Sequence, residues 1–184
     1  MDIQVFACGL IVFGKRVFRC ALGHGGVRSH KREGDGATPA GHFALREVLY
    51  RPDCEQLPIT RLGISPISYN DGWCDDPSAP VYNRRIKLPH PANHEKLFRS
   101  DGIYNIVVPL GYNDTPPVPN LGSAIFLHLA REDYSPTNGC VAVARQDLLT
   151  ILLAIKPGDR LTINHTSQRS SHGHQKLLTQ PGQP

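Results

Sequence analysis

The chain has 184 residues, of which 40% are hydrophobic and 20% are charged, with a formal net charge of +4 at neutral pH. This composition lies in the ordinary range for globular chains, and the length suits a single domain with its own core. The only basic run, residues 28–32, is short and poor in aromatic residues, so the sequence does not favour a nucleic-acid partner.

The five cysteines are widely spaced, odd in number and form no Cys-x-x-Cys pair. They are Cys8, Cys20, Cys54, Cys74 and Cys140. This pattern argues against a disulfide framework and against a zinc ribbon.

The N-terminal stretch, residues 3–13, is apolar but does not resemble a secretory signal. Asp2 stands where such signals carry basic residues, and Lys15 and Arg16 follow without a small-residue cleavage site. No apolar run approaches the roughly 18 residues of a membrane-spanning helix. We therefore expect a cytoplasmic protein with no membrane partner, or a periplasmic one if another route exports it.

Short apolar runs between glycines and prolines predict a mainly β protein with minor α structure. We expect residues 3–13 and 15–22 to form a hairpin that turns at Phe13-Gly14, and residues 42–48 to form a further strand.

The region from residue 50 to residue 121 is rich in loops, and its most unusual stretches are residues 71–77 and 82–84. Long ordered loops in compact domains are usually functional. Trp73 lies in the acidic loop 71–77, where it would either line a substrate groove or cover the core. Residues 102–110 and 123–130 are two more expected strands.

The second of these strands contains His128, and a short loop leads from it to Asn138-Gly139-Cys140. Acyl transfer needs a thiolate, a base and donors aimed at the developing oxyanion. Cys140, His128 and the amides of residues 138–140 would supply all three, and a nearby imidazolium would lower the thiol pKa. The same residues also fit an inert apolar cysteine and a surface histidine.

One helix is expected at about residues 146–156, because Leu148, Ile151 and Leu152 fall on one face and Pro157-Gly158 ends the pattern. Residues 160–164 then form a last strand. Residues 166–184 are polar and rich in Gly, Ser and Gln, so we expect a disordered tail after a single domain over residues 1–165.

The segment Ser-Pro-Thr-Asn-Gly-Cys at 135–140, preceded by His128, resembles the signature of the L,D-transpeptidase (YkuD-type) catalytic domain family. In that family a histidine leads a loop that ends in Ser/Thr-x-Gly-Cys. Residues 36–43, Gly-Ala-Thr-Pro-Ala-Gly-His-Phe, are similar to the family's Thr-Pro-x-Gly-x-Phe turn. The resemblance extends loosely over residues 5–163 and implies a β-sandwich of mixed sheets.

The chain departs from the family pattern at three positions. Leu129 follows the histidine where glycine is common, Asn138 stands where histidine is frequent, and Ala142 replaces an arginine. If that arginine holds a substrate carboxylate, another residue must replace it.

Three arginines are candidates for that role, each with the alternative of a solvated surface charge: Arg131, Arg145 and Arg84. Tyr134 and Thr137 are further substrate-binding candidates in the loop that ends at Cys140.

The resemblance implies a reaction on the stem peptides of peptidoglycan. Cys140 would attack the carbonyl between the L-centre of a diamino acid and a terminal D-Ala, the backbone near Gly139 would hold the oxyanion, and His128 would protonate the leaving amine. Resolution of the thioester by an amine makes a transpeptidase, and resolution by water an L,D-carboxypeptidase. A cytoplasmic location would favour hydrolysis of soluble muropeptides during wall recycling, by a monomer without a cofactor.

Two other functions stay open: an inactive module that binds peptidoglycan, and an unrelated cysteine amidase. A metal site at Asp75, Asp76, His90 and His94 is not expected, because the proline next to His90 disfavours a helical two-histidine face.

Overall fold

The computed structural model describes residues 2–165 as a mainly β protein with one helix. The expected disordered tail, residues 166–184, lies outside the described residues. The elements of the first half are β1 (Asp2–Phe6), β2 (Leu10–Phe13), β3 (Arg16–Ala21), β4 (Val27–Arg28), β5 (Thr38–Pro39), β6 (Gly41–Ala44), β7 (Val48–Tyr50), β8 (Ile64–Pro66) and β9 (Asp71–Cys74). Those of the second half are β10 (Arg85–Lys87), β11 (His94–Lys96), β12 (Ile106–Pro109), β13 (Phe126–Leu129), β14 (Val141–Val143), α1 (Arg145–Ala154) and β15 (Arg160–Asn164).

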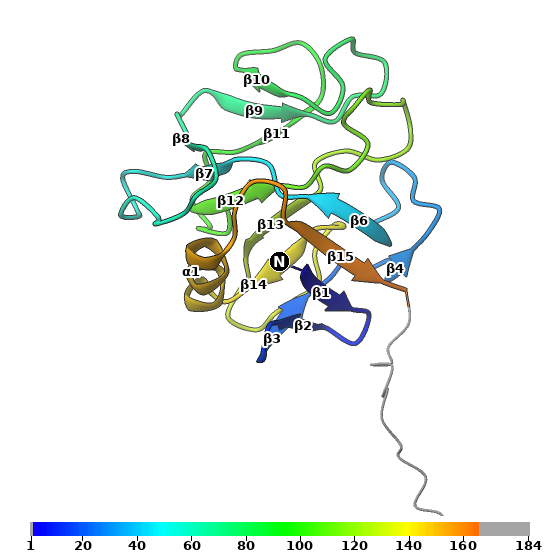
Figure 1. Ribbon diagram of the computed structural model, residues 1–184. Coiled ribbons are helices and arrows are strands. Elements are labelled where there is room, and N and C mark those ends of the chain that lie inside the picture. The colour runs from blue at the N-terminus through cyan, green and yellow to red at the C-terminus, as the bar shows by residue number, and fades with distance from the viewer. Residues whose placement is uncertain (1, 166–184) are drawn as a thin grey trace, which may run out of the picture.

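Ten of the strands form one sheet in the order β6-β15-β1-β2-β3-β14-β13-β12-β7-β8. The sheet is mixed: β1 with β15, β13 with β14, and β7 with β8 are parallel pairs, and the other neighbours are antiparallel. It curls, so that the half containing β1 and β15 faces the half containing β12 to β14 (Figure 1). This is the β-sandwich of mixed strands that the sequence predicts.

The main core lies between these two halves because alternate residues of each strand point inward. Ile3 and Val5 from one half and Leu127 and Val141 from the other are fully buried in it. α1 covers the end of this core with its buried residues Leu148, Ile151 and Leu152. The helix spans two residues fewer at its end than the predicted 146–156, and its presence and its apolar face are confirmed.

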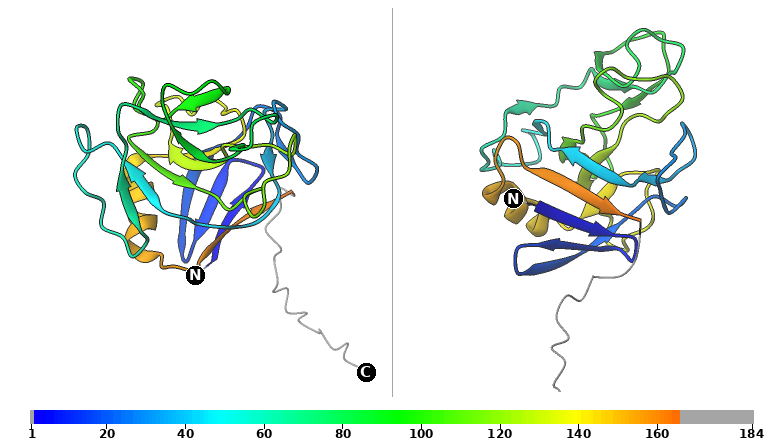
Figure 2. Two further views of the ribbon diagram at one scale, coloured as in Figure 1. Left: turned by 90° about the horizontal axis from the view of Figure 1, so that it is seen from above. Right: turned by 45° about the vertical axis from the view of Figure 1, so that its right-hand side comes forward.

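A second, smaller core lies on the outer face of β12 and β13. Val107 and Phe126, whose chain neighbours face the main core, point outward and pack with Leu97 and Tyr104. A three-stranded sheet, in the order β10-β9-β11, lies beyond β12 at this end of the molecule and covers the outer face (Figures 1 and 2). Cys140 belongs to this second core.

Two expected strands are broken in the structure. Residues 3–13 form two strands rather than one, because Gly9, with a φ of +81°, turns the chain back and lets Ile3 pair with Phe13. The hairpin at Phe13-Gly14 is present, but it joins β2 to β3. Residues 42–48 divide into the end of β6 and the start of β7.

The expectation of a loop at residues 71–77 is wrong for its first half, which is β9. The strand was missed because its residues do not alternate between apolar and polar. Asp71 is fully buried, and its carboxylate accepts hydrogen bonds from Arg85 Nη2 and Lys87 Nζ, both at 2.7 Å. These ion pairs join β9 to β10, so this part of the small sheet is held by charged side chains and could not be found from an apolar pattern.

Candidate active site

Cys140 lies on the tight turn that leads into β14. Gly139 has a φ of +130°, and a Cβ atom there would lie 2.7 Å from the carbonyl oxygen of Ala37, so only glycine fits. The hydroxyl of Thr137 closes the turn, since it accepts a hydrogen bond from the Gly139 amide at 3.1 Å and donates to the Cys140 carbonyl at 2.7 Å. The Thr-x-Gly-Cys motif thus has a local structural reason.

The sulfur of Cys140 is held by the backbone of the neighbouring strand. It accepts a hydrogen bond from the Phe126 amide at 3.3 Å and donates to the carbonyl of Ala124 at 3.3 Å. The side chain is only 6% exposed, and burial, followed by the charge of Glu95, raises the pKa of the thiol to about 12. The thiol is therefore protonated at neutral pH.

His128 is the third of the four residues of β13, and its side chain is buried, with 4% of the residue exposed. Its Nδ1 is 2.9 Å from the carbonyl oxygen of Leu129. Because a carbonyl only accepts, Nδ1 carries the proton and Nε2 keeps the lone pair that a general base needs. The ring of Tyr104 packs edge-on against the imidazole, with centroids 5.2 Å apart, so a backbone carbonyl and an aromatic ring fix its orientation.

The expectation that an imidazolium lowers the thiol pKa is wrong for this site. Burial lowers the pKa of His128 to about 4, so the imidazole is neutral at pH 7. Desolvation disfavours the charged form of both groups, and the resting pair is a thiol with a neutral imidazole.

The strand register places the two side chains on one face. His128 is opposite Ala142 in the parallel pair of β13 and β14, which puts Cys140 beside Phe126, two residues before His128. Residues two apart on a strand face the same side and lie ~6.6 Å apart along it. Cys140 and His128 line the same cavity, which has a volume of about 480 Å³.

The two sequence motifs, about 100 residues apart, meet beneath this cavity. The buried hydroxyl of Thr38 accepts a hydrogen bond from the Gly23 amide at 2.8 Å. The next residue, His24, donates its amide to the Thr137 carbonyl at 2.9 Å, and the Thr137 amide donates to Leu22. The residue 36–43 motif therefore supports the turn that carries Cys140.

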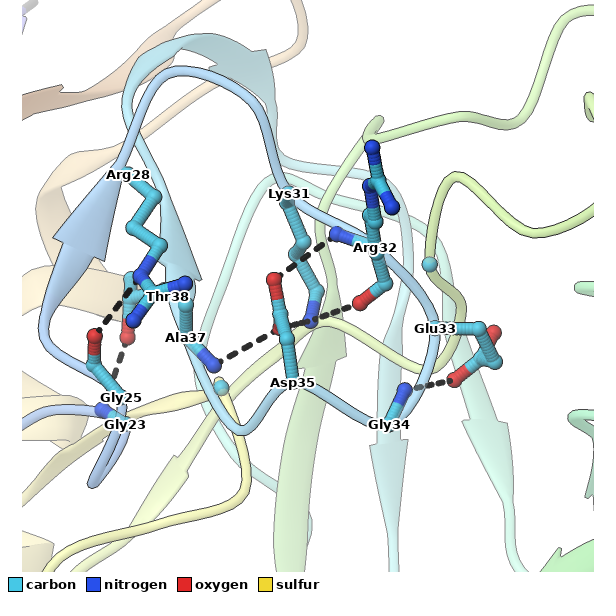
Figure 3. A network of polar contacts seen from close by, with 12 residues as sticks. Gly23, Gly25, Arg28, Lys31, Arg32, Glu33, Gly34, Asp35, Ala37 and Thr38 are labelled. Carbon is cyan, nitrogen blue, oxygen red and sulfur yellow. Dashed lines mark hydrogen bonds and ion pairs between the residues drawn. The ribbon is translucent and has the colours of Figure 1, made fainter.

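The loop between β4 and β5 is folded around one carboxylate. Asp35 accepts hydrogen bonds from the side chain of Lys31 at 2.7 Å, the Arg32 amide at 2.8 Å and the Ala37 amide at 2.9 Å (Figure 3). The contact with Asp35 holds Lys31 at the cavity wall, and Glu33 of the same loop also lines the cavity.

Five of the predicted site residues line the cavity: Cys140, His128, Asn138, Thr137 and Arg131. Five others lie outside its lining: Gly139, Tyr134, Trp73, Arg84 and Arg145.

Each side chain outside the lining has another environment. The ring of Trp73 packs edge-on against Phe126 with centroids 5.1 Å apart, and its Nε1 donates to Asn83 at 2.9 Å. Arg145, on α1, forms an ion pair with Glu55.

The remaining two residues lie on the surface side of their loops. Tyr134 lies under the guanidinium of Arg19, at 4.2 Å from the ring centroid. Arg84 is exposed. Of the three arginine candidates, only Arg131 reaches the cavity.

Several charged or polar residues of the cavity were not identified from the sequence: Lys31, Glu33, Asp75, Glu95, Arg99 and Tyr104. They come from separate loops and from the β9–β11 sheet, and no spacing along the chain connects them. Tyr104 donates to Glu95 at 2.7 Å, which links this group to the ring beside His128.

No group of three or more His, Cys, Asp or Glu residues within residues 2–165 is placed to hold a metal ion. His90 and His94 instead bond to the backbone of Ala92. In the same range, no helix has the length and apolar character needed to cross a bilayer.

A buried thiol and an imidazole line one cavity, and the thiol follows a turn that only glycine permits, which is the arrangement expected of a cysteine nucleophile. The model of the L,D-transpeptidase catalytic domain (YkuD) matches residues 10–163, and the chain therefore belongs to this family of cysteine-dependent enzymes, which act on peptidoglycan stem peptides. A comparison with curated protein sequences finds no match.

Among solved structures, the chain is similar to L,D-transpeptidase 1 of Mycobacterium tuberculosis, with a TM-score of 0.42 and 11% identity. The likeness covers 88% of this chain and 57% of the mycobacterial chain.

Proposed function

We propose that this protein is a cysteine acyl-transfer enzyme that cleaves the bond between the L-centre and D-Ala of peptidoglycan tetrapeptide stems. The observation that carries the proposal is that Cys140 and His128 lie on one face of the paired strands β13 and β14 and line one cavity. The family assignment supports the substrate class.

The neutral resting pair defines the first step. His128 Nε2 takes the thiol proton as the sulfur attacks the substrate carbonyl, so charge separates only when the new bond forms. The amide of Gly139 already donates to Thr137, which leaves the amides of Asn138 and Cys140 as the donors nearest the oxyanion. His128 then protonates the amine of D-Ala, and a thioester remains on Cys140.

The second step needs a nucleophile that His128 deprotonates. Water releases a tripeptide and makes the enzyme an L,D-carboxypeptidase, whereas an amine of a second stem forms a cross-link. The thiolate that leaves recovers its proton from His128, which restores the resting pair.

Arg131 is our candidate for the substrate carboxylate. It lines the cavity, its side chain is 50% exposed, and it forms an ion pair with Asp101 at 3.0 Å that solvent weakens. Its guanidinium is therefore free to exchange this partner for the carboxylate of D-Ala.

The test is to incubate purified protein with a disaccharide tetrapeptide, with and without a second tetrapeptide as amine acceptor, and to weigh the products. Loss of the terminal alanine indicates hydrolysis, and a covalent dimer indicates transpeptidation. Cys140→Ala should give neither. Unchanged substrate with the unmodified protein would reject the proposal, and retained binding without turnover would favour the inactive module.

The cytoplasmic location stays a prediction. Fractionation of native cells followed by immunodetection would check it, and recovery in the periplasm would contradict it.

A further inference from the structure

Three carboxylates, Glu33, Asp75 and Glu95, line the same cavity as Cys140. Glu33 accepts hydrogen bonds from the hydroxyls of Tyr82 and Ser123, and Glu95 accepts one from Tyr104. These two carboxylates have partners within the protein.

Asp75 differs from the other two. Its Oδ1 exposes less than 1 Å² and has no hydrogen-bond partner within the described residues. Its amide donates to the Asn93 carbonyl at 3.2 Å, which fixes the backbone of this partly buried residue directly after β9. A buried carboxylate oxygen without a donor is costly, so a ligand that brings a donor to this oxygen would gain binding energy.

The charges around the cavity favour a cationic ligand. The three cations in the lining are already paired: Lys31 with Asp35, Arg131 with Asp101, and Arg99 with both Asp101 and Glu95. No ion pair between described residues includes Asp75 or Glu33. The site therefore has five carboxylates, namely the three in the lining and the ion-pair partners Asp35 and Asp101, but only three cations.

The neighbouring carboxylates add to the effect of burial on the pKa values of this group, whereas His94 and Arg99 oppose it. Burial, together with the charge of Glu33, raises the pKa of Asp75, and burial with the charge of Asp75 raises that of Glu95. A positive group placed among them would relieve both effects.

The geometry also selects the kind of cation. The described residues offer no group of ligands that would hold a metal ion. A single buried oxygen suits the point charge of an ammonium better than a guanidinium, which prefers two parallel hydrogen bonds.

We infer that Asp75 is a specificity-determining residue that binds a primary ammonium on the side chain of the acyl-donor residue, while Cys140 attacks the carbonyl of that same residue. This inference rests on the proposed function and adds the residue that reads the substrate. The ammonium belongs to the donor and not to the attacking acceptor, because a carboxylate keeps an amine protonated and an attacking amine must be neutral.

The experiment uses two synthetic tetrapeptides, L-Ala-γ-D-Glu-L-Lys-D-Ala and the same peptide with norleucine in place of lysine. Norleucine keeps the aliphatic chain and removes only the amine. Binding is measured by calorimetry with Cys140→Ala protein, alone and combined with Asp75→Asn or Asp76→Asn, and D-Ala release is measured with the unmodified protein. Asp76 is the matched control, because its carboxylate bonds to Ser78 and does not line the cavity.

We expect the Cys140→Ala protein to bind the lysine peptide about 10- to 100-fold more tightly than the norleucine peptide, the value of a charge-assisted hydrogen bond. Asp75→Asn should reduce this preference to within about 3-fold, and Asp76→Asn should leave it intact. Asp75→Asn should also leave the thermal midpoint unchanged or higher, because it neutralises a carboxylate whose Oδ1 has no hydrogen-bond donor among the described residues. A preference that survives Asp75→Asn, or no preference at all, would overturn the inference.

The two proposals fail in different ways. If the unmodified protein releases D-Ala equally from both peptides, the acyl-transfer function stands and the role of Asp75 is rejected. If neither peptide is cleaved while the binding preference depends on Asp75, the recognition stands and the reaction is rejected.

Discussion

At the scale of single residues, the proposed chemistry depends on two groups that burial keeps uncharged. The thiol of Cys140 and the imidazole of His128 each lie almost wholly out of water, where the ion pair costs most. Because the resting thiol is protonated, we expect it to react slowly with electrophiles other than a substrate carbonyl bound in the cavity.

This state predicts an unusual pH dependence. Because the pKa of His128 is lowered to about 4, kcat/KM for D-Ala release should stay constant as pH falls from 8 to about 5 and then decrease near pH 4. A histidine in water would give this decrease near about 6.5. Initial rates at each pH, with circular dichroism to verify folding, would check it, and an acid limb near 6.5 would contradict it.

The same shift affects stability with a defined sign. Between pH 6.5 and about 4 the unfolded chain binds the proton and the native chain does not. The contribution of His128 to stability is therefore complete above pH 6.5 and decreases as pH falls through this window.

Gly139 gives a second prediction at this scale. Gly139→Ala should abolish D-Ala release and lower stability by about 1–3 kcal/mol, because the new Cβ meets the Ala37 carbonyl and the φ of +130° is strained. Gly14→Ala is the control: its φ is +60°, but nothing lies within 4 Å of the added Cβ. Thermal unfolding of both variants would separate the cost of the positive φ from the cost of the contact between the new Cβ and the Ala37 carbonyl. If both variants lost activity equally, that contact would have no role.

Cys140 and His128 could be predicted as neighbours in one site from the sequence, because they lie in one short segment that ends in Asn-Gly-Cys, and both line the cavity. The rest of the cavity was not. Glu33, Asp75 and Glu95 are acidic residues in polar loops, and such residues usually face solvent. Only the fold shows that they converge.

At the scale of elements, prediction succeeded where strands have an apolar face. Residues 160–164 and the 146–156 helix follow the expected periods, and β15 and α1 lie there. The sheet of β9 to β11 has no such pattern. Its strands read Asp-Gly-Trp-Cys, Arg-Ile-Lys and His-Glu-Lys, and a buried carboxylate takes the place of an apolar contact.

This substitution of charge for apolar packing can be tested through Asp71. Asp71→Asn should lower stability by about 2–4 kcal/mol, because it leaves two cations facing a buried neutral group. Asp114→Asn, which breaks the more exposed pair with Arg46, should cost at most about 1 kcal/mol. Urea unfolding would measure both, and similar losses would show that the buried pair is not special.

At the scale of the whole molecule, the catalytic turn depends on a segment about 100 residues earlier. Thr38 is fully buried and bonds to Gly23, whose neighbour His24 bonds to the Thr137 carbonyl. The order of the two motifs along the chain predicted the family, but the contact between them could be seen only in the folded structure.

Thr38→Val therefore tests the coupling between the two motifs. It keeps the volume and removes the acceptor, so the buried Gly23 amide loses its partner at a cost of about 1–3 kcal/mol. We expect a fall in kcat larger than that in a control, Thr162→Val, whose hydroxyl contacts His42 away from the cavity. Unfolding curves and D-Ala release from both variants give the comparison, and equal losses of kcat would show that the first motif contributes stability alone.

The strands that carry Cys140 and His128 have their inner sides packed in the main core. These two strands cannot shift without disturbing the packing of the entire sandwich. The β9–β11 sheet, which places Asp75 and Glu95 at the cavity, lies outside this main core. Substitutions in the β9–β11 sheet can therefore alter substrate selectivity without disturbing the packed strands beside Cys140 and His128.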